Sequence, residues 1–120
     1  MRSLLLLVND LAEIRSIHER HLRAAEFDVL SAGDAVTLID LALQSHPRAI
    51  LIDDALPRSS AWEALEVLQK HPSLRGIPRI LIGWLIAGTS RAARLAGAQG
   101  FVPKPCAAAD LVREVRRVLA

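Results

Sequence analysis

The chain has 120 residues, of which 52% are hydrophobic and 23% are charged, so it can bury the core of one globular domain and is too short for two. This composition excludes an intrinsically disordered chain. The excess of two positive charges, from 15 Lys and Arg against 13 Asp and Glu, gives no argument for direct nucleic-acid binding. The single cysteine, Cys106, excludes an internal disulfide and suits a reducing compartment, so we expect a cytoplasmic protein.

The apolar stretches of the chain are too short to cross a membrane. The first, Leu4–Val8, imitates a signal peptide, but it meets Asn9 and Asp10 instead of a small-residue cleavage site. The longest uncharged stretch of comparable hydrophobicity, Ile80 to Gly88, has about half the length that a bilayer-spanning helix needs. We therefore expect no membrane partner.

Apolar runs of strand length alternate with segments of helical periodicity along the whole chain. The runs are mostly continuous in Leu, Ile and Val, which is typical of parallel strands covered on both faces. The predicted strands are Leu4–Val8, Phe27–Ser31, Ala49–Ile52, Arg79–Ile82 and Gly100–Val102.

Amphipathic helices are predicted between and after these strands. Apolar residues recur at helical spacing over residues 14–25, 36–43 and 61–68, and two further helices are expected over Thr89–Ala96 and Ala108–Leu119. Ser60 with Glu63 predicts a capping box, while prolines after His46 and His71 close two helices. Five strand–helix units in series predict a single doubly wound α/β domain over residues 1–120, with a parallel sheet and helices on both faces.

In a doubly wound sheet, ligands bind beyond the carboxyl ends of the strands. Asn9 and Asp10 follow the first predicted strand, Asp53 ends the third, Gly83 ends the fourth, and Lys104 stands between two prolines after the fifth. Each residue also has a structural explanation: Asp10 as a helix cap, Asp53 as a loop residue and Lys104 as a solvated loop cation. Their joint occurrence at strand ends favours a site.

This combination resembles the receiver domain of two-component response regulators, in the CheY-like superfamily. The resemblance covers the whole chain and rests on ordered motifs: Asp10 with Arg15, Pro47 six residues before Asp53, Asp53-x-x-Leu56-Pro57, Gly97-Ala98 ahead of Phe101, and Lys104-Pro105. It implies a flavodoxin-like sheet of order 2-1-3-4-5. It also implies a signalling module and not an enzyme.

The resemblance assigns roles to the strand-end residues. Asp53 would accept a phosphoryl group from a histidine kinase or a phosphotransfer protein, and Lys104 would contact the phosphoryl oxygens. Mg²⁺ would be held by Asp10, Asp53 and the backbone carbonyl of Ala55, which agrees with the oxygen ligands that this ion prefers. Signalling to a downstream protein target would use the last two helices and the fifth strand, and a homodimer stays open.

Several positions depart from the family pattern. Asn9 replaces the usual first acidic residue, and the lost charge predicts Mg²⁺ binding weakened by about 10- to 100-fold. Gly83 replaces a hydroxyl residue, and the switch aromatic, Phe101, has no hydroxyl, so we expect phosphorylation to be poorly coupled to the fourth-helix face. Ala55 and Leu85 cannot orient an attacking water, which predicts slow self-dephosphorylation.

Four other features have milder interpretations. The apolar segment from Trp84 to Gly88 is a candidate docking patch, with the alternative that Trp84 and Ile86 fold back onto the core. Cys106 is expected to be a small buried hydrophobe. His18 and His21 lack a third ligand at metal-binding spacing. The arginines of the last helix predict a solvated or dimer-facing surface: Arg113, Arg116 and Arg117.

Two other functions stay open. One is a pseudo-receiver, a phosphorylation-independent protein-binding module in which Asp53 and Lys104 form a structural ion pair. The other is a small flavodoxin-like enzyme that binds a nucleotide or flavin. The enzyme is disfavoured because Asn9-Asp10-Leu11-Ala12 follows the first strand, where a Gly-rich or Ser/Thr-rich phosphate loop would be needed.

Overall fold

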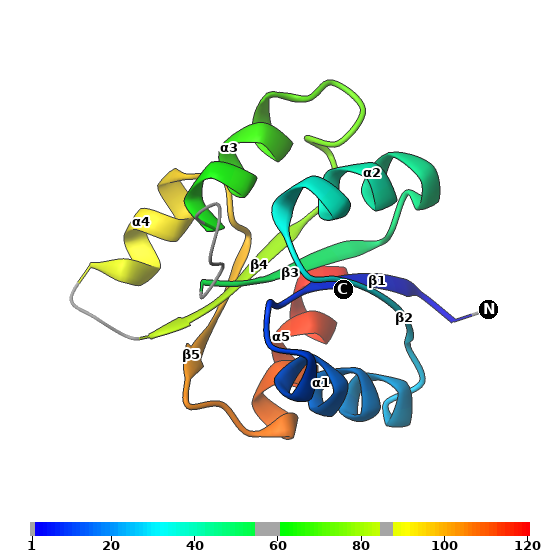
Figure 1. Ribbon diagram of the computed structural model, residues 1–120. Helices are drawn as coiled ribbons and strands as arrows, with labels where there is room; N and C mark the ends of the chain where they lie inside the picture. The colour runs from blue at the N-terminus through cyan, green and yellow to red at the C-terminus, as the bar shows by residue number, and fades with distance from the viewer. Residues whose placement is uncertain (1, 55–60, 85–87) are drawn as a thin grey trace.

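The computed structural model describes residues 2–54, 61–84 and 88–120, and Figure 1 shows a central sheet between two layers of helices. The five strands are parallel and lie in the order β2-β1-β3-β4-β5, which confirms the predicted α/β fold and strand order. Their bounds are β1 (Leu4–Val8), β2 (Asp28–Ala32), β3 (Ala49–Asp53), β4 (Arg79–Trp84) and β5 (Gly100–Lys104).

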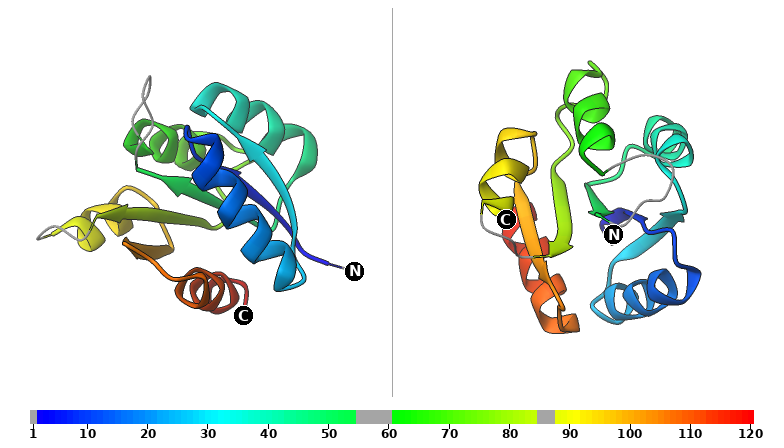
Figure 2. Two further views of the ribbon diagram at one scale, coloured as in Figure 1. Left: turned by 60° about the horizontal axis from the view of Figure 1, so that its bottom comes forward. Right: turned by 60° about the vertical axis from the view of Figure 1, so that its left-hand side comes forward.

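Helices cover both faces of the sheet, as Figures 1 and 2 show: α1 and α5 lie on one face, and α2, α3 and α4 lie on the other. Their bounds are α1 (Ala12–Ala24), α2 (Ala35–Ser45), α3 (Ala61–Lys70), α4 (Thr89–Leu95) and α5 (Ala108–Leu119). In the described ranges no helix has the length and hydropathy that a membrane crossing requires.

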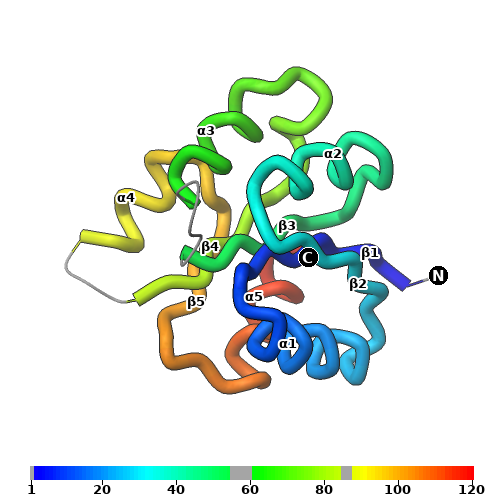
Figure 3. The backbone as a smooth tube through the Cα atoms, in the orientation of Figure 1, coloured from blue at the N-terminus to red at the C-terminus, as the bar shows by residue number. Residues whose placement is uncertain are grey.

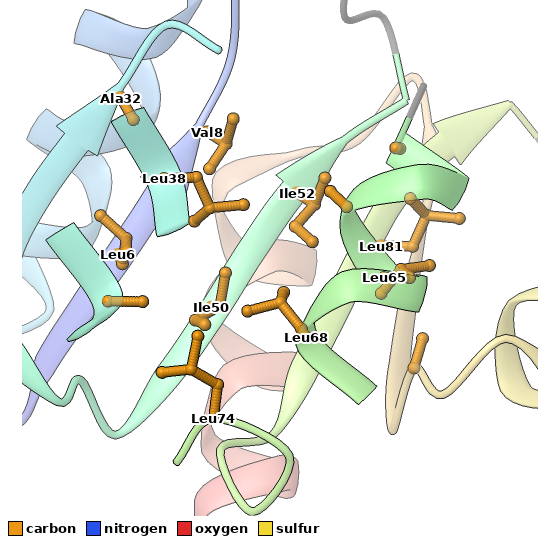
Figure 4. Close-up of a cluster of buried hydrophobic side chains, with 14 of the residues drawn as sticks. Leu6, Val8, Ala32, Leu38, Ile50, Ile52, Leu65, Leu68, Leu74 and Leu81 are labelled. Carbon is orange, nitrogen blue, oxygen red and sulfur yellow. The ribbon is translucent and has the colours of Figure 1, made fainter. Parts of the chain in front are cut away.

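Each strand feeds two separate cores, which explains why the strand sequences are apolar without alternation. In β1, Leu6 and Val8 join the core beneath α2, α3 and α4, part of which Figure 4 shows, while Leu5 and Leu7 join the core beneath α1 and α5. Successive side chains of a strand point to opposite faces, so a strand buried on both sides needs an apolar residue at every position.

Three strands extend further than their apolar runs predict. β3 continues to Asp53, β4 to Trp84 and β5 to Lys104, because backbone pairing goes on past the last apolar residue: Asp53 pairs with Ile82, and Trp84 pairs with Lys104. The polar residues at the strand ends are therefore held by the sheet itself. β2 begins one residue later than predicted, at Asp28.

Most of the predicted helix boundaries agree with the structure. α2 ends at Ser45, and its C-cap, His46, has the left-handed φ of 45°; α3 ends at Lys70, just before the second His-Pro pair. α4 is one residue shorter than predicted, ending at Leu95, and Gly97 follows with φ 102°, a conformation that favours glycine. The predicted capping residue Ser60 lies outside the described residues.

The first residue of β4, Arg79, has a buried guanidinium. This burial is unexpected, because the sequence indicates only that a strand starts at Arg79. Arg79 is 1% exposed. It donates to the backbone carbonyls of Arg75 (2.7 Å), Ile77 (2.6 Å) and Gly97 (3.1 Å), and to the Gln69 side chain. Burial lowers the pKa of Arg79. One side chain thus joins α3, the segment before β4 and the segment after α4, at the end of the strand away from its carboxyl terminus.

Candidate functional site

The carboxyl ends of the parallel strands lie along one edge of the sheet (Figure 3) and bring together residues far apart in sequence. Asn9 directly follows β1, Asp53 ends β3 and Lys104 ends β5. Asp53 accepts one hydrogen bond from Lys104 Nζ at 2.6 Å and another from Asn9 Nδ2 at 2.8 Å. The sequence predicts that Asp10, Asp53 and Lys104 meet; the structure brings Asp53 and Lys104 together, and the third residue in direct contact with Asp53 is Asn9.

Asp53 is the buried centre of this cluster. Asp53 is 1% exposed, and its two carboxylate oxygens have separate donors: Oδ1 faces the ammonium of Lys104 and Oδ2 faces the amide of Asn9. A buried carboxylate is costly unless it is paired and hydrogen-bonded, and both requirements are met here. The alternative explanation of Asp53 as a loop residue is wrong.

Lys104 is also not a solvated loop cation, because its side chain is only 18% exposed and bridges two carboxylates. Besides Asp53, it donates to Asp54 Oδ1 at 2.8 Å. Burial alone lowers the pKa of Lys104, but the hydrogen bonds and charges of Asp53 and Asp54 outweigh it and hold that pKa above its usual value. Lys104 is therefore a firmly charged ammonium at neutral pH.

Asn9 is held so that its N–H group, and not its oxygen, faces Asp53. Its Oδ1 accepts from the backbone N–H of Leu11 at 2.8 Å, and its backbone carbonyl accepts from Arg15 Nη1 at 2.6 Å. These contacts leave Nδ2 as the group that reaches Asp53. Asn9 therefore serves as a neutral donor where a carboxylate would supply a further cation ligand.

Asp10 has a buried carboxylate oxygen, Oδ1, with no hydrogen-bond partner among the described residues. The N-cap of α1 is Leu11 and has no side-chain capping bond, so the explanation of Asp10 as a helix cap is wrong. A buried, orphaned carboxylate oxygen beside the strand ends suits a hard cation. Within the described ranges, no group of three or more His, Cys, Asp and Glu side chains is arranged to hold a metal, and Ala55 lies outside those ranges.

The two predicted switch positions lie at β4 and β5. Gly83 pairs with Pro103 in the sheet, one residue before the end of β4. Phe101 is half-buried against the core beneath α4, and its backbone N–H donates to Glu114 Oε2 at 2.9 Å. Ala55 and Leu85, on which the prediction of slow self-dephosphorylation rests, lie outside the described residues.

A cavity of about 280 Å³ opens beside Asp53, toward α1 and the start of α5. Its apolar wall is made by Leu11, Ile14, Ile82, Trp84, Pro105 and Cys106. Trp84 is 56% exposed, so the alternative that Trp84 folds back onto the core is wrong, while Ile86 lies outside the described residues. Cys106 is half-buried instead of fully buried, and burial raises the pKa of its thiol.

His18 also lines this cavity, a position that the sequence analysis missed. The spacing of Leu11, Ile14 and His18 is that of one helix face, which is the signal that would have placed His18 near the site. Its Nδ1 is buried and has no hydrogen-bond partner among the described residues. Burial is the main reason that the pKa of His18 is lowered; the nearby Asp53 charge opposes this, and His21 and Lys104 add to it.

The lowered pKa of His18 predicts a loss of stability in mild acid. The unfolded chain binds the proton at the ordinary value of about 6.5, above the folded pKa, so the free energy of unfolding falls as the pH drops through that window. Chemical denaturation at pH about 7.5 and about 5.5 should show a smaller loss for His18→Gln than for the wild type. His46→Asn, an exposed histidine beyond α2, is the matched control. Equal losses in wild type and His18→Gln would contradict this assignment.

This chain is similar in sequence to known response regulators. Residues 5–116 match the family model of the response regulator receiver domain. The probable transcriptional regulator ycf27 of Porphyridium aerugineum is 28% identical over 96% of this chain, which spans only 47% of that relative's length. The polar-differentiation response regulator DivK of Brucella ovis is 25% identical over 82% of this chain and 80% of its own.

Solved structures show the same fold. The chemotaxis response regulator CheY4 of Vibrio cholerae superposes with a TM-score of 0.91 at 21% identity, over 99% of this chain and all of that one. The receiver domain of the sensor histidine kinase PA1611 from Pseudomonas aeruginosa, which has a magnesium ion coordinated in its active-site cleft, gives a TM-score of 0.89 at 24% identity, over 99% of this chain and 98% of its own.

Proposed function

Because this chain belongs to the response regulator receiver family of two-component signalling, we propose that it accepts a phosphoryl group on Asp53 and passes the signal on through protein contacts. The observation that carries the proposal is the Asp53 carboxylate, buried at a strand end and bonded to Lys104 at 2.6 Å. Receiver domains are in general signalling modules and not enzymes, and this arrangement suits a phosphoryl acceptor that is itself modified.

The transfer needs little from the protein beyond positioning. The P–N bond of a donor phosphohistidine breaks, its electron pair stays on the imidazole nitrogen, and a P–O bond forms to a carboxylate oxygen of Asp53. Lys104 supplies a compact positive charge for the phosphoryl oxygens. The sheet fixes both side chains, since Asp53 ends β3 and Lys104 ends β5, and both strands are hydrogen-bonded to β4 between them.

Asp10, Asp53 and the carbonyl of Ala55 are the proposed ligands of Mg²⁺. The orphaned Oδ1 of Asp10 supports the fit, and the neutral Asn9 weakens it because its N–H faces Asp53. When bound, this ion neutralises phosphoryl oxygens.

The proposed output surface is formed by α4, β5 and α5. Five exposed arginines cover its two helices: Arg91, Arg94, Arg113, Arg116 and Arg117. Two backbone groups at the start of β5 already have side-chain partners from α5: Phe101 N–H donates to Glu114, and the carbonyl of Gln99, just before the strand, accepts from Arg117 at 3.0 Å. We expect a downstream protein, or a second copy of the chain, to contact the side chains of this surface.

We expect phosphorylation to change this output surface only slightly. Gly83 offers no hydroxyl to a phosphoryl group, so the bond that would favour one conformation of Phe101 over another is missing. Amide spectra of α4 and β5 recorded with and without a beryllofluoride mimic should be nearly identical, while amides beside Asp53 shift. Large shifts over α4 would contradict weak coupling.

Acetyl phosphate provides the direct test of the proposed function. With Mg²⁺ present, the intact mass of the wild type should rise by one phosphoryl group, and the mass of Asp53→Asn should stay unchanged. Asp40→Asn, the same change at an exposed position on α2, should behave as the wild type. No mass gain in the wild type would overturn the proposal.

The second candidate function is a pseudo-receiver that binds proteins without phosphorylation. It is favoured by one observation: Lys104 is bonded to both Asp53 and Asp54, so the ion pair is complete without a ligand. A wild type that takes up no phosphoryl group yet loses stability when Lys104 is replaced by Met would support this alternative.

A further inference from the structure

Asp54 is an acidic residue at the site to which the motif pattern assigns no role. It follows directly after β3, and its side chain is 25% exposed. Its Oδ1 accepts from Lys104 Nζ at 2.8 Å, and its Oδ2 accepts from the backbone N–H of Trp84 at 3.2 Å. The carboxylate thus bridges an ammonium at the end of β5 and a backbone donor at the end of β4.

Gly83 makes room for this carboxylate. A Cβ atom at position 83 would lie 2.9 Å from Asp54 Oδ2 and 3.3 Å from its Cγ, closer than side-chain carbons normally approach. A serine or threonine there would force Asp54 to move. The absence of a side chain at Gly83 therefore both removes the hydroxyl and leaves the space that the Asp54 carboxylate occupies.

Asp53 and Asp54 share the same cation. Lys104 Nζ lies 2.6 Å from Asp53 Oδ1 and 2.8 Å from Asp54 Oδ1, so both oxygens are packed around one ammonium. A phosphoryl group on Asp53 would bring close to two negative charges beside Lys104, next to the Asp54 carboxylate. Like charges at this separation repel strongly where solvent access is limited.

We infer that Asp54 is a built-in anion that occupies two donors beside Asp53, Lys104 Nζ and the Trp84 amide, and competes with the incoming phosphoryl group for them. Phosphorylation then requires Asp54 to give up both contacts. This also supplies a physical reason for weak coupling: a phosphoryl group replaces one anion by another at the same donors, so the two states differ little in their contacts there. The inference rests on the proposed function in naming the competing group.

The competition has a direct readout in the binding of inorganic phosphate. Phosphate is titrated while the amide resonance of Trp84 is followed in wild type, Asp54→Ala and Asp54→Asn, with Asp40→Ala as the charge-matched control on α2. We expect about tenfold tighter binding in both Asp54 variants, since each removes a like charge from Lys104. The control should bind as the wild type does.

A second readout is the initial rate of mass gain with acetyl phosphate, which should rise about tenfold in the same variants. Lys104 keeps Asp53 as a partner in each, and the isosteric Asp54→Asn provides a test even if Asp54→Ala fails to fold. Equal phosphate affinity in wild type and both variants overturns the inference, whether or not Asp53 is phosphorylated. Tighter phosphate binding without mass gain in any variant supports the role of Asp54 and instead overturns phosphorylation at Asp53.

Discussion

Replacing Asn9 by aspartate is expected to tighten Mg²⁺ binding by about 10- to 100-fold. A unit charge about 4 Å from a cation is worth roughly 4 kcal/mol in a partly wet site, and desolvation cancels much of it, leaving one to two decades. The structure adds a second contribution. Asn9 Nδ2 now donates to Asp53 at 2.8 Å, and an aspartate would replace that bond by repulsion between two carboxylates, which a cation relieves.

The same variant should be less stable than the wild type without Mg²⁺ and regain stability as the ion is added, because a ligand that binds only the folded state stabilises it. Calorimetric titration gives the affinity, and thermal unfolding over a Mg²⁺ series gives the stability. Gln44→Glu adds the same charge at an exposed position on α2 and should change neither. Equal Mg²⁺ affinity in wild type and Asn9→Asp would remove the argument that Asn9 weakens the site.

The second large effect is a loss of stability, expected when Arg79 at the amino end of β4 is replaced. Arg79→Met should lower the free energy of unfolding by about 3 kcal/mol, because the hydrogen bonds of the guanidinium, each worth about 1 kcal/mol net, are lost. Arg75, Ile77 and Gly97 would all lose the donor to their carbonyl oxygens. Methionine retains most of the apolar stem, so the loss reports on the hydrogen bonds and not on a cavity.

Urea denaturation measures this difference. Arg75→Met is the matched control, since Arg75 is exposed and its backbone carbonyl is retained. Phosphoryl uptake should persist in Arg79→Met under conditions where the variant is folded. Arg79 starts β4 and pairs with Ile50, whereas Asp53 pairs with Ile82 further along the strand, so the two residues lie toward opposite ends of β4. A loss below about 1 kcal/mol, no more than the control, would show that water replaces the guanidinium at these carbonyls.

The order and type of the elements are predictable from local pattern alone. Continuous apolar runs such as Leu4–Val8 are buried on both faces, and a strand of that kind has few alternatives to a parallel sheet covered by helices. The strand ends are less predictable. β4 and β5 extend to Trp84 and Lys104 because the partner strand supplies backbone hydrogen bonds, which residue preferences do not encode.

The candidate site divides in the same way. The identity of Asn9, Asp53 and Lys104 follows from the sequence, since polar residues at the ends of parallel strands meet at one edge of the sheet. The partners of each side chain do not. The bridging role of Asp54 depends on the space left by Gly83, 29 residues away, and on a backbone donor from the next strand.

The burial of His18 and of Arg79 likewise depends on the tertiary structure. The helical spacing of His18 and the polar character of Arg79 are visible in the chain, but their burial is not. Local pattern is sufficient for periodicity and for which residues end a strand, because those depend on near neighbours. Hydrogen-bond partners, burial and shared cations depend on segments brought together through space, and these set the charge balance around Asp53.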